Sequence, residues 1–256
     1  RAAAGGVVYL SRIDVHSAVI SSALAVACDA AAHDGWTPDG RVERDAHHAA
    51  RAATRGGLAL AERTRLQELA LRAAAAAGIA AVHEMGAPHV GPEHDLVSLS
   101  RLEDAAAAED RPVPHVVPFW AARVGDEQDA RAALERFAEQ GVRLAWLGGD
   151  LNADGSIGSR TAAFREPYAD PGPAVTHGRR YLSADEVAEQ VVACTLAGVR
   201  TGFHAIGDAA VDVVLDGIES AARSLGAARV VAAGHRLEHA EAVDAGAVAR
   251  IARLGL

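Results

Sequence analysis

The stretch Gly202-Phe-His-Ala-Ile-Gly-Asp208 joins a short apolar run to the start of a segment with helical spacing. A short apolar run followed by such a segment predicts a buried β-strand that leads into a helix. His204 then lies at the carboxyl end of the strand, where α/β proteins build their ligand sites. The stretch therefore predicts a fold class and the place of a functional site.

The same order of strand and helix repeats on both sides of this stretch. Apolar or β-branched runs predict strands over residues 79–82, 113–119, 142–147, 199–203 and 230–233. Apolar stripes predict helices over 126–140, 183–198, 208–225 and 244–254, and Ser183 with Glu186 has the pattern of a capping box. Alternation of this kind is typical of a parallel sheet, either a partial (β/α)8 TIM-like barrel or an open, doubly wound sheet. Periodicity does not separate the two.

The chain divides into two parts by composition. Residues 1–78 are expected to be mostly helical, with a strand over 7–11, and residues 79–256 hold the β/α units, about strands 2 to 6 of a barrel, with a long loop over 148–182. A whole barrel takes about 250 residues, so a barrel made from these units lacks its first strand and its last strands. Because the chain begins with Arg1 and has its only methionine at Met85, we expect a fragment.

Composition excludes several classes of protein. Half of the 256 residues are hydrophobic, which is enough for a folded core. The formal net charge of -9 argues against a nucleic-acid or anionic-membrane partner, because both need a concentrated cationic surface. No membrane span or signal peptide is recognised, and the two distant cysteines do not suggest a disulfide framework, so a reducing cytoplasm is the expected location.

A second histidine motif follows one β/α unit after the first. Arg236-Leu-Glu-His239 also lies at the end of a predicted strand. Neighbouring parallel strands end at the same edge of a sheet, so we expect the imidazoles of His204 and His239 to converge. Two neutral imidazoles form half of a site for zinc or a similar divalent ion. The competing interpretation is that both histidines hydrogen-bond to helix ends or backbone.

The long loop carries further polar candidates. Asp150, at the end of its strand, could be a carboxylate ligand, and Asp154 and Arg160 could line a polar pocket that binds substrate. The loop has neither the glycine order of a dinucleotide site nor the lysine of a P-loop, which argues against a nucleotide. The alternative is a surface loop rich in turn-forming residues.

Other histidines carry weaker signals. His83, near a predicted strand end, and His16, in a turn before a helix, are candidate substrate-binding residues. His47 and His48 are adjacent on a predicted helix and so point in different directions, and we expect both to be solvated.

Several of these motifs, in this order, resemble the metal-dependent amidohydrolase superfamily. Four segments carry the resemblance: His83-Glu-Met-Gly86, Asp154-Gly-Ser-Ile-Gly-Ser-Arg-Thr-Ala162, Phe203-His-Ala-Ile-Gly-Asp208 and Arg236-Leu-Glu-His239. It extends to Tyr9-Leu-Ser-Arg-Ile-Asp-Val-His-Ser17 and so covers nearly the whole chain. More narrowly, the chain is similar to the amidohydrolase 3 group, which includes N-substituted formamide deformylases and YtcJ-like proteins.

The resemblance implies a (β/α)8 barrel with a metal site at the carboxyl ends of its strands. It assigns His204 to the strand-5 ligand and His239 to the strand-6 ligand, and it puts Asp150 where many relatives have a carboxylated lysine. Asp is several bonds shorter than that lysine, so we expect one ion, with zinc as the first candidate, rather than two. The family's His-x-His and its strand-8 aspartate, the proton carrier, have no match here, so the catalytic residue is unknown and expected outside this chain. Asp208 and Glu238 are candidate acceptors for the second nitrogens of the histidines.

The resemblance further implies hydrolysis of a non-peptide C–N bond of amide type by metal-activated water, with the fragment alone expected to be inactive. The partner is a small-molecule substrate, and a homo-oligomer is compatible with the sequence. The alternative is a catalytically impaired barrel that acts as a small-molecule binding or regulatory protein.

Overall fold

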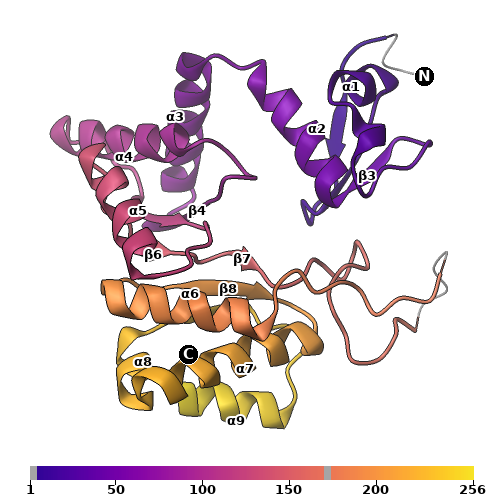
Figure 1. Ribbon diagram of the computed structural model, residues 1–256. Helices are drawn as coiled ribbons and strands as arrows, with labels where there is room; N and C mark the ends of the chain where they lie inside the picture. The colour runs from indigo at the N-terminus through magenta and orange to yellow at the C-terminus, as the bar shows by residue number, and fades with distance from the viewer. Residues whose placement is uncertain (1–4, 170–173) are drawn as a thin grey trace.

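A computed structural model describes residues 5–169 and 174–256 (Figure 1). Asp170, in the long loop predicted over 148–182, lies outside the described residues, as does Arg1. Among the described residues, no helix combines the length and low polarity that a membrane-spanning segment needs.

The N-terminal part contains a small antiparallel sheet as well as the expected helices. The sheet has the order β1-β2-β3, with β1 Tyr9–Ser11, β2 Ser17–Ile20 and β3 Arg41–Glu43. The helices are α1 Ser22–Ala27, the 3-10 turn η1 Ala30–Ala32, α2 Arg44–Gly56 and α3 Leu60–Ala76. The sheet, α1, η1 and α2 share a core of their own around Leu24, Val42 and Ala46. Strands β2 and β3 were not predicted, because three or four residues show too little alternation to identify a strand.

From Ala81 onward the chain alternates parallel strands with helices. The strands are β4 Ala81–Gly86, β5 His115–Trp120, β6 Trp146–Leu147, β7 Leu151–Asn152, β8 Gly202–Ala205 and β9 Arg236–His239. The helices are α4 Glu93–Ala108, α5 Glu127–Glu139, α6 Ala184–Ala197, α7 Asp208–Leu225, α8 Ala227–Ala233 and α9 Ala245–Leu254.

These strands pair in the order in which they occur in the sequence. One parallel sheet has the order β4-β5-β6 and the other β7-β8-β9. A parallel bridge between Trp146 and Arg200 connects the two sheets. No reversal of strand order, as in a doubly wound sheet, occurs among the described strands. The described strands also do not close into a barrel.

Local capping signals fixed most helix ends where the sequence predicted them. Ser183 and Glu186 form the reciprocal capping box, and Gly198 ends α6 with a φ of 74°. Asp126 and Asp244 cap α5 and α9 through their side chains. The predicted strand over 230–233 is wrong: these residues belong to α8, and the strand follows at Arg236–His239. A four-residue apolar run fits a buried helix turn as well as a strand.

The largest core holds β8 in place. Phe203 is fully buried among residues of α6 and α7, including Val187, Val191 and Val214. In Figure 1, α7, α8 and α9 lie below β8, and α6 overlaps the strand. Close packing of this kind restricts side-chain motion, so β8 presents His204 from a rigid support.

Candidate metal centre

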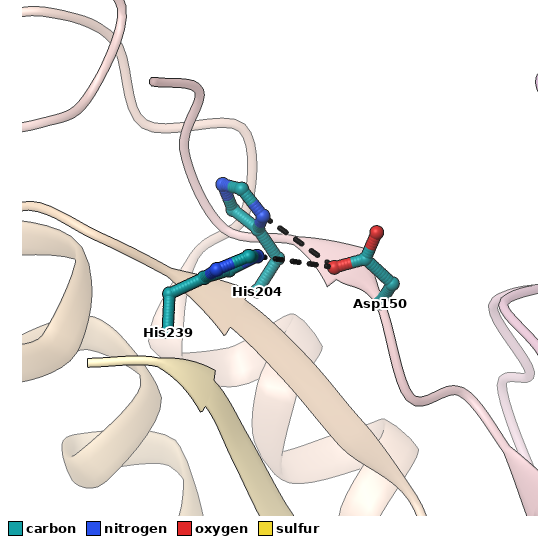
Figure 2. Close-up of side chains that lie close together, drawn as sticks. All are labelled: Asp150, His204 and His239. Atoms are coloured by element: carbon teal, nitrogen blue, oxygen red, sulfur yellow. Dashed lines mark ion pairs between the residues drawn. The ribbon is translucent and has the colours of Figure 1, made fainter. Parts of the chain in front are cut away.

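A break between β6 and β7 positions Asp150. Gly148 and Gly149 occupy the break with φ values of 125° and 96°, a region that favours glycine. A Cβ on Gly149 would lie 2.3 Å from the Phe119 ring, so the backbone approaches this ring more closely than any other residue allows. The next residue, Asp150, brings its carboxylate to the ends of β8 and β9 (Figure 2).

Three donor atoms converge at this point, as the sequence predicted. Asp150 Oδ1 lies 3.4 Å from His204 Nδ1 and 3.9 Å from His239 Nε2, and one atom from each residue lies within 4.8 Å of the others. The rings of His204 and His239 are 4.5 Å apart, and Figure 2 shows both facing the same carboxylate oxygen. His204 is buried at 1% exposure, whereas Asp150 and His239 are 35% and 42% exposed. A small ion could therefore enter from the side of Asp150 and His239.

The second nitrogen of His204 fixes the orientation of its ring. Nε2 donates a hydrogen bond to the Gly155 carbonyl at 3.0 Å, which leaves Nδ1 facing Asp150. For His204 the expected acceptors were wrong: its partner is the Gly155 carbonyl, whereas Asp208 accepts from the Arg165 backbone N–H and Glu238 pairs with Arg236. Both carboxylates lie on elements that turn them toward arginines instead.

The charges of Asp150 and His204 support each other. Burial lowers the pKa of His204, but its hydrogen bonds to Asp150 and the Gly155 carbonyl outweigh burial and raise it. Burial raises the pKa of Asp150, but His204 and His239 outweigh that effect and lower it. The carboxylate is thus held in its charged form.

The donor set fits a divalent ion such as zinc. In a tetrahedral zinc site with bonds of about 2.0–2.1 Å, neighbouring ligand atoms lie about 3.3 Å apart. The Asp150–His204 distance of 3.4 Å matches this spacing, and the Asp150–His239 distance of 3.9 Å is slightly larger. Two imidazoles and a carboxylate are also a ligand combination that zinc accepts.

The backbone at the end of β9 is strained. His239 and Ala240 have φ values of 69° and 48°, which cost about 1–3 kcal/mol each for a non-glycine residue. The Ala240 N–H donates to the Ala205 carbonyl at 3.0 Å, so pairing with the end of β8 holds this conformation. Such strain concentrates at functional sites.

Asp154 holds the loop against the end of β8. Its fully buried carboxylate accepts backbone hydrogen bonds from Ala163, Ile206 and Gly207 at 2.8–3.0 Å. Burial raises its pKa, whereas the three N–H groups lower it less. Its substrate-binding role stays a prediction, and its position favours a structural role beside His204.

A cavity of about 690 Å³ adjoins the centre. Asp150 and His16 line it, and the His16 ring lies 5.2 Å from the His204 ring. Burial, followed by the nearby His204, lowers the pKa of His16 to about 4. His16 is therefore a neutral side chain between the cavity and the three donor atoms.

Two other predicted residues do not line this cavity. Arg160 lies over the Tyr168 ring at 5.0 Å and contacts the Ala174 carbonyl. His83 lies within β4 rather than at its end, because the strand continues to Gly86. Its ring packs 5.2 Å from Phe119. The substrate-binding roles of Arg160 and His83 therefore stay predictions.

One face of α2 supplies cavity residues that the sequence analysis missed. Four residues line the cavity at positions i, i+3, i+4 and i+7: Arg44, His47, His48 and Arg51. The expectation that both histidines are solvated was wrong for His47, which is 1% exposed and has its Nε2 2.6 Å from the Tyr9 hydroxyl, whereas His48 is half-buried. The helical spacing of these residues was the available signal.

Comparisons with known proteins identify the family to which the chain belongs. The sequence profile described as "Amidohydrolase family" matches residues 1–256. The chain is 34% identical over 97 residues to N-substituted formamide deformylase of Arthrobacter pascens, covering 34% of this chain and 17% of the relative. It is 33% identical over 102 residues to the putative amidohydrolase YtcJ of Bacillus subtilis, covering 40% and 18%.

A solved structure extends the similarity to the fold. An uncharacterized metal-dependent hydrolase from Pyrococcus furiosus superposes with a TM-score of 0.63 and 25% identity, covering 97% of this chain and 49% of the other. The chain thus spans about half of that protein and less of the curated relatives. The profile match over its whole length shows that the chain belongs to the amidohydrolase family.

Proposed function

We propose that the protein is a metal-dependent hydrolase that cleaves a non-peptide C–N bond of amide type in a small molecule. One divalent ion, with zinc as the first candidate, would be held by Asp150, His204 and His239. The observation that carries the proposal is the convergence of these three donor atoms within 4.8 Å, next to a cavity of about 690 Å³. A bound divalent ion would polarise the substrate carbonyl and lower the pKa of water.

The protein groups have distinct parts in this proposal. The Gly155 carbonyl keeps the proton of His204 on Nε2, so that Nδ1 stays available as a ligand atom. Asp150 contributes both a ligand atom and part of the cavity wall, so the substrate would meet the ion at this residue. The neutral His16 borders the same space and would contact the substrate.

The fold proposed around this centre is part of a (β/α)8 barrel. Parallel strands that pair in sequence order, with helices between them, support barrel winding. A single ion is proposed because Asp150 is too short to take the bridging place of a carboxylated lysine. The two cysteines are free thiols in the structure, which fits the reducing cytoplasm that we propose as the location.

The test combines metal analysis with hydrolysis. The purified full-length protein should contain about one equivalent of a divalent ion and hydrolyse members of a panel of formamides, acetamides, lactams and cyclic imides. Hydrolysis should release an amine from the open-chain amides and open the rings of the lactams and imides. Chelation should abolish turnover, and added zinc should restore it. Asp150→Asn and His204→Ala should lose the ion, whereas the exposed controls Asp104→Asn and His33→Ala should keep it.

Two results would decide against the proposal. Unchanged metal content in Asp150→Asn and His204→Ala would remove the assigned site. Stable metal binding without turnover of any panel member would instead favour a small-molecule binding protein, in line with the aspartate at the position of the lysine.

A further inference from the structure

The basic residues that line the cavity differ in whether their charge is compensated. Arg44 pairs with Asp34 at 2.8 Å and with Glu43 at 3.6 Å. Arg123 pairs with Glu186 and Glu189. Arg51, on the same face of α2 as Arg44, forms no ion pair within residues 5–169 and 174–256.

The contacts of Arg51 hold its guanidinium at the cavity without neutralising it. Nη2 donates to the Val15 carbonyl at 2.7 Å and lies 3.5 Å from His47 Nε2. A guanidinium has five N–H donors. In the described part of the chain, the remaining donors of Arg51 have no protein acceptor.

The histidines around Arg51 add hydrogen-bonding groups but no charge. Burial, followed by neighbouring positive groups that include Arg51, lowers the pKa of His47 to about 3 and that of His48 to about 4. Burial and Arg51 also lower the pKa of His89, which lies between β4 and α4 and lines the same cavity. At neutral pH these three rings are therefore uncharged.

The carboxylates of the cavity do not compensate Arg51. Asp150 belongs to the candidate metal centre, where His204 and His239 face it. Asp45, six positions before Arg51 on α2, lines the cavity but forms no ion pair with it in the described structure. One cationic guanidinium thus remains for a ligand.

We propose that Arg51 is a specificity-determining residue that binds a carboxylate of the substrate, so that the protein prefers amides that carry a carboxylate away from the scissile bond. This inference rests on the proposed hydrolase function. A planar guanidinium binds a carboxylate through two parallel N–H···O bonds. The single positive charge of Arg51 can be neutralised by a ligand with one negative charge. The neutral histidines allow the rest of the substrate to be uncharged.

Binding is tested first, with ligands that contain no bond to hydrolyse. Hydrocinnamate and hydrocinnamyl alcohol differ by a carboxylate in place of a hydroxymethyl group, and their affinities are measured by titration calorimetry at neutral pH. The protein should bind hydrocinnamate about tenfold more tightly than the alcohol, the size expected of a charged hydrogen-bonded pair. Arg51→Gln should abolish this preference, Arg51→Lys should keep part of it, and Arg123→Gln should keep all of it.

A preference retained in Arg51→Gln would overturn the inference, because the carboxylate would then be bound elsewhere, such as at the ion. Equal affinities in the unmodified protein, or no binding of either ligand, would also overturn it. Circular dichroism of each variant identifies loss of folding. If Arg51→Gln does not fold, Arg51→Lys, which keeps the charge and the length of the side chain, decides the test by whether its preference for hydrocinnamate is reduced.

Hydrolysis separates this inference from the proposed function. N-formylphenylalanine and N-formylphenethylamine differ only in the carboxylate, and their kcat/KM values should differ by about tenfold in favour of the acid. Arg51→Gln should lower kcat/KM for the acid alone. Equal kcat/KM for both would refute the inference and keep the hydrolase, whereas no turnover with an intact Arg51-dependent binding preference would refute the hydrolase and keep the carboxylate site.

Discussion

Replacing Asp154 by Asn tests whether the backbone hydrogen bonds that Asp154 accepts support the metal centre. Asp154 Oδ2 accepts from the N–H groups of Ala163 and Gly207, and Oδ1 accepts from that of Ile206. An asparagine has the same shape but one amide NH2 in place of a carboxylate oxygen. Its least costly orientation keeps the oxygen at Ala163 and Gly207 and turns the NH2 toward the Ile206 N–H.

The magnitude follows from these three bonds. The variant loses one charge-assisted hydrogen bond, about 1.5–3 kcal/mol, and leaves a buried donor unpaired, about 1–3 kcal/mol. Removal of the buried charge returns part of its desolvation cost, which is consistent with the raised pKa of Asp154. We therefore expect Asp154→Asn to lower the free energy of unfolding by about 2–4 kcal/mol.

The effect on the metal centre is a second readout. Gly155, whose carbonyl accepts from His204 Nε2, directly follows Asp154. Loss of an outer hydrogen bond to a ligating histidine typically lowers metal affinity by about 10–100-fold. Urea unfolding and zinc titration measure the two effects, with the exposed Asp104→Asn as control, expected within about 0.5 kcal/mol. An Asp154→Asn protein that matched the parent in both assays would refute the claim that the hydrogen bonds of Asp154 stabilise the fold and the metal centre.

Two further predictions concern the strand break and the pH dependence. Gly149→Ala places a Cβ 2.3 Å from Phe119 at a φ of 96° and should lower the free energy of unfolding by about 2–4 kcal/mol. The control Gly141→Ala, at a φ of 83° with open space around it, should lower it by about 1 kcal/mol. Equal losses in the two variants would contradict the steric cause. Burial lowers the pKa of His235 to about 4 from 6.5, so the native state keeps this ring neutral while the unfolded chain takes up a proton. Its contribution to stability is present above pH 6.5 and is lost as the pH falls toward 4, by about 3 kcal/mol at about 1.4 kcal/mol per unit. Acid unfolding of His235→Gln should show a correspondingly shallower slope over this range, and an unchanged slope would rule out His235 as the group responsible.

Local signals predicted the helices better than the short strands. The start of α6 is determined by two side chains three residues apart, Ser183 and Glu186, so it can be identified without any tertiary contact. The residues of α8 could not be assigned in this way, because a buried residue such as Val230 is as compatible with a strand as with a helix, and only Gly234, with its φ of 70°, marks a helix end. Strands β2 and β3 depend on each other's pairing, which is a long-range property.

The residues of the candidate site also divide into those that local sequence signals predict and those that depend on long-range contacts. His204 and His239 could be brought together from the sequence because adjacent parallel strands end at a common edge. Asp150 was a candidate ligand from its place at a predicted strand end, and the resemblance then matched it to a position of the family's metal site. The cavity face of α2 could not be found from composition, since Arg44, His47, His48 and Arg51 are polar residues typical of a solvated helix. Their place at the cavity results from contact with distant segments, such as the Tyr9 hydroxyl at the buried His47 and the Val15 carbonyl at Arg51.

The position of Asp150 also bears on the number of ions. A carboxylate that bridges two ions needs a separate set of donors on each of its sides. Asp150 Oδ1 alone faces both His204 and His239, and within residues 5–169 and 174–256 no other histidine, cysteine or carboxylate joins them in a cluster of metal-binding geometry. His16 comes near, with its ring 5.2 Å from that of His204, but it is outside the cluster. A second ion would therefore have no second cluster of three donors in this part of the chain, which is why we expect a stoichiometry of one even though the resemblance puts Asp150 at the position of a carboxylated lysine.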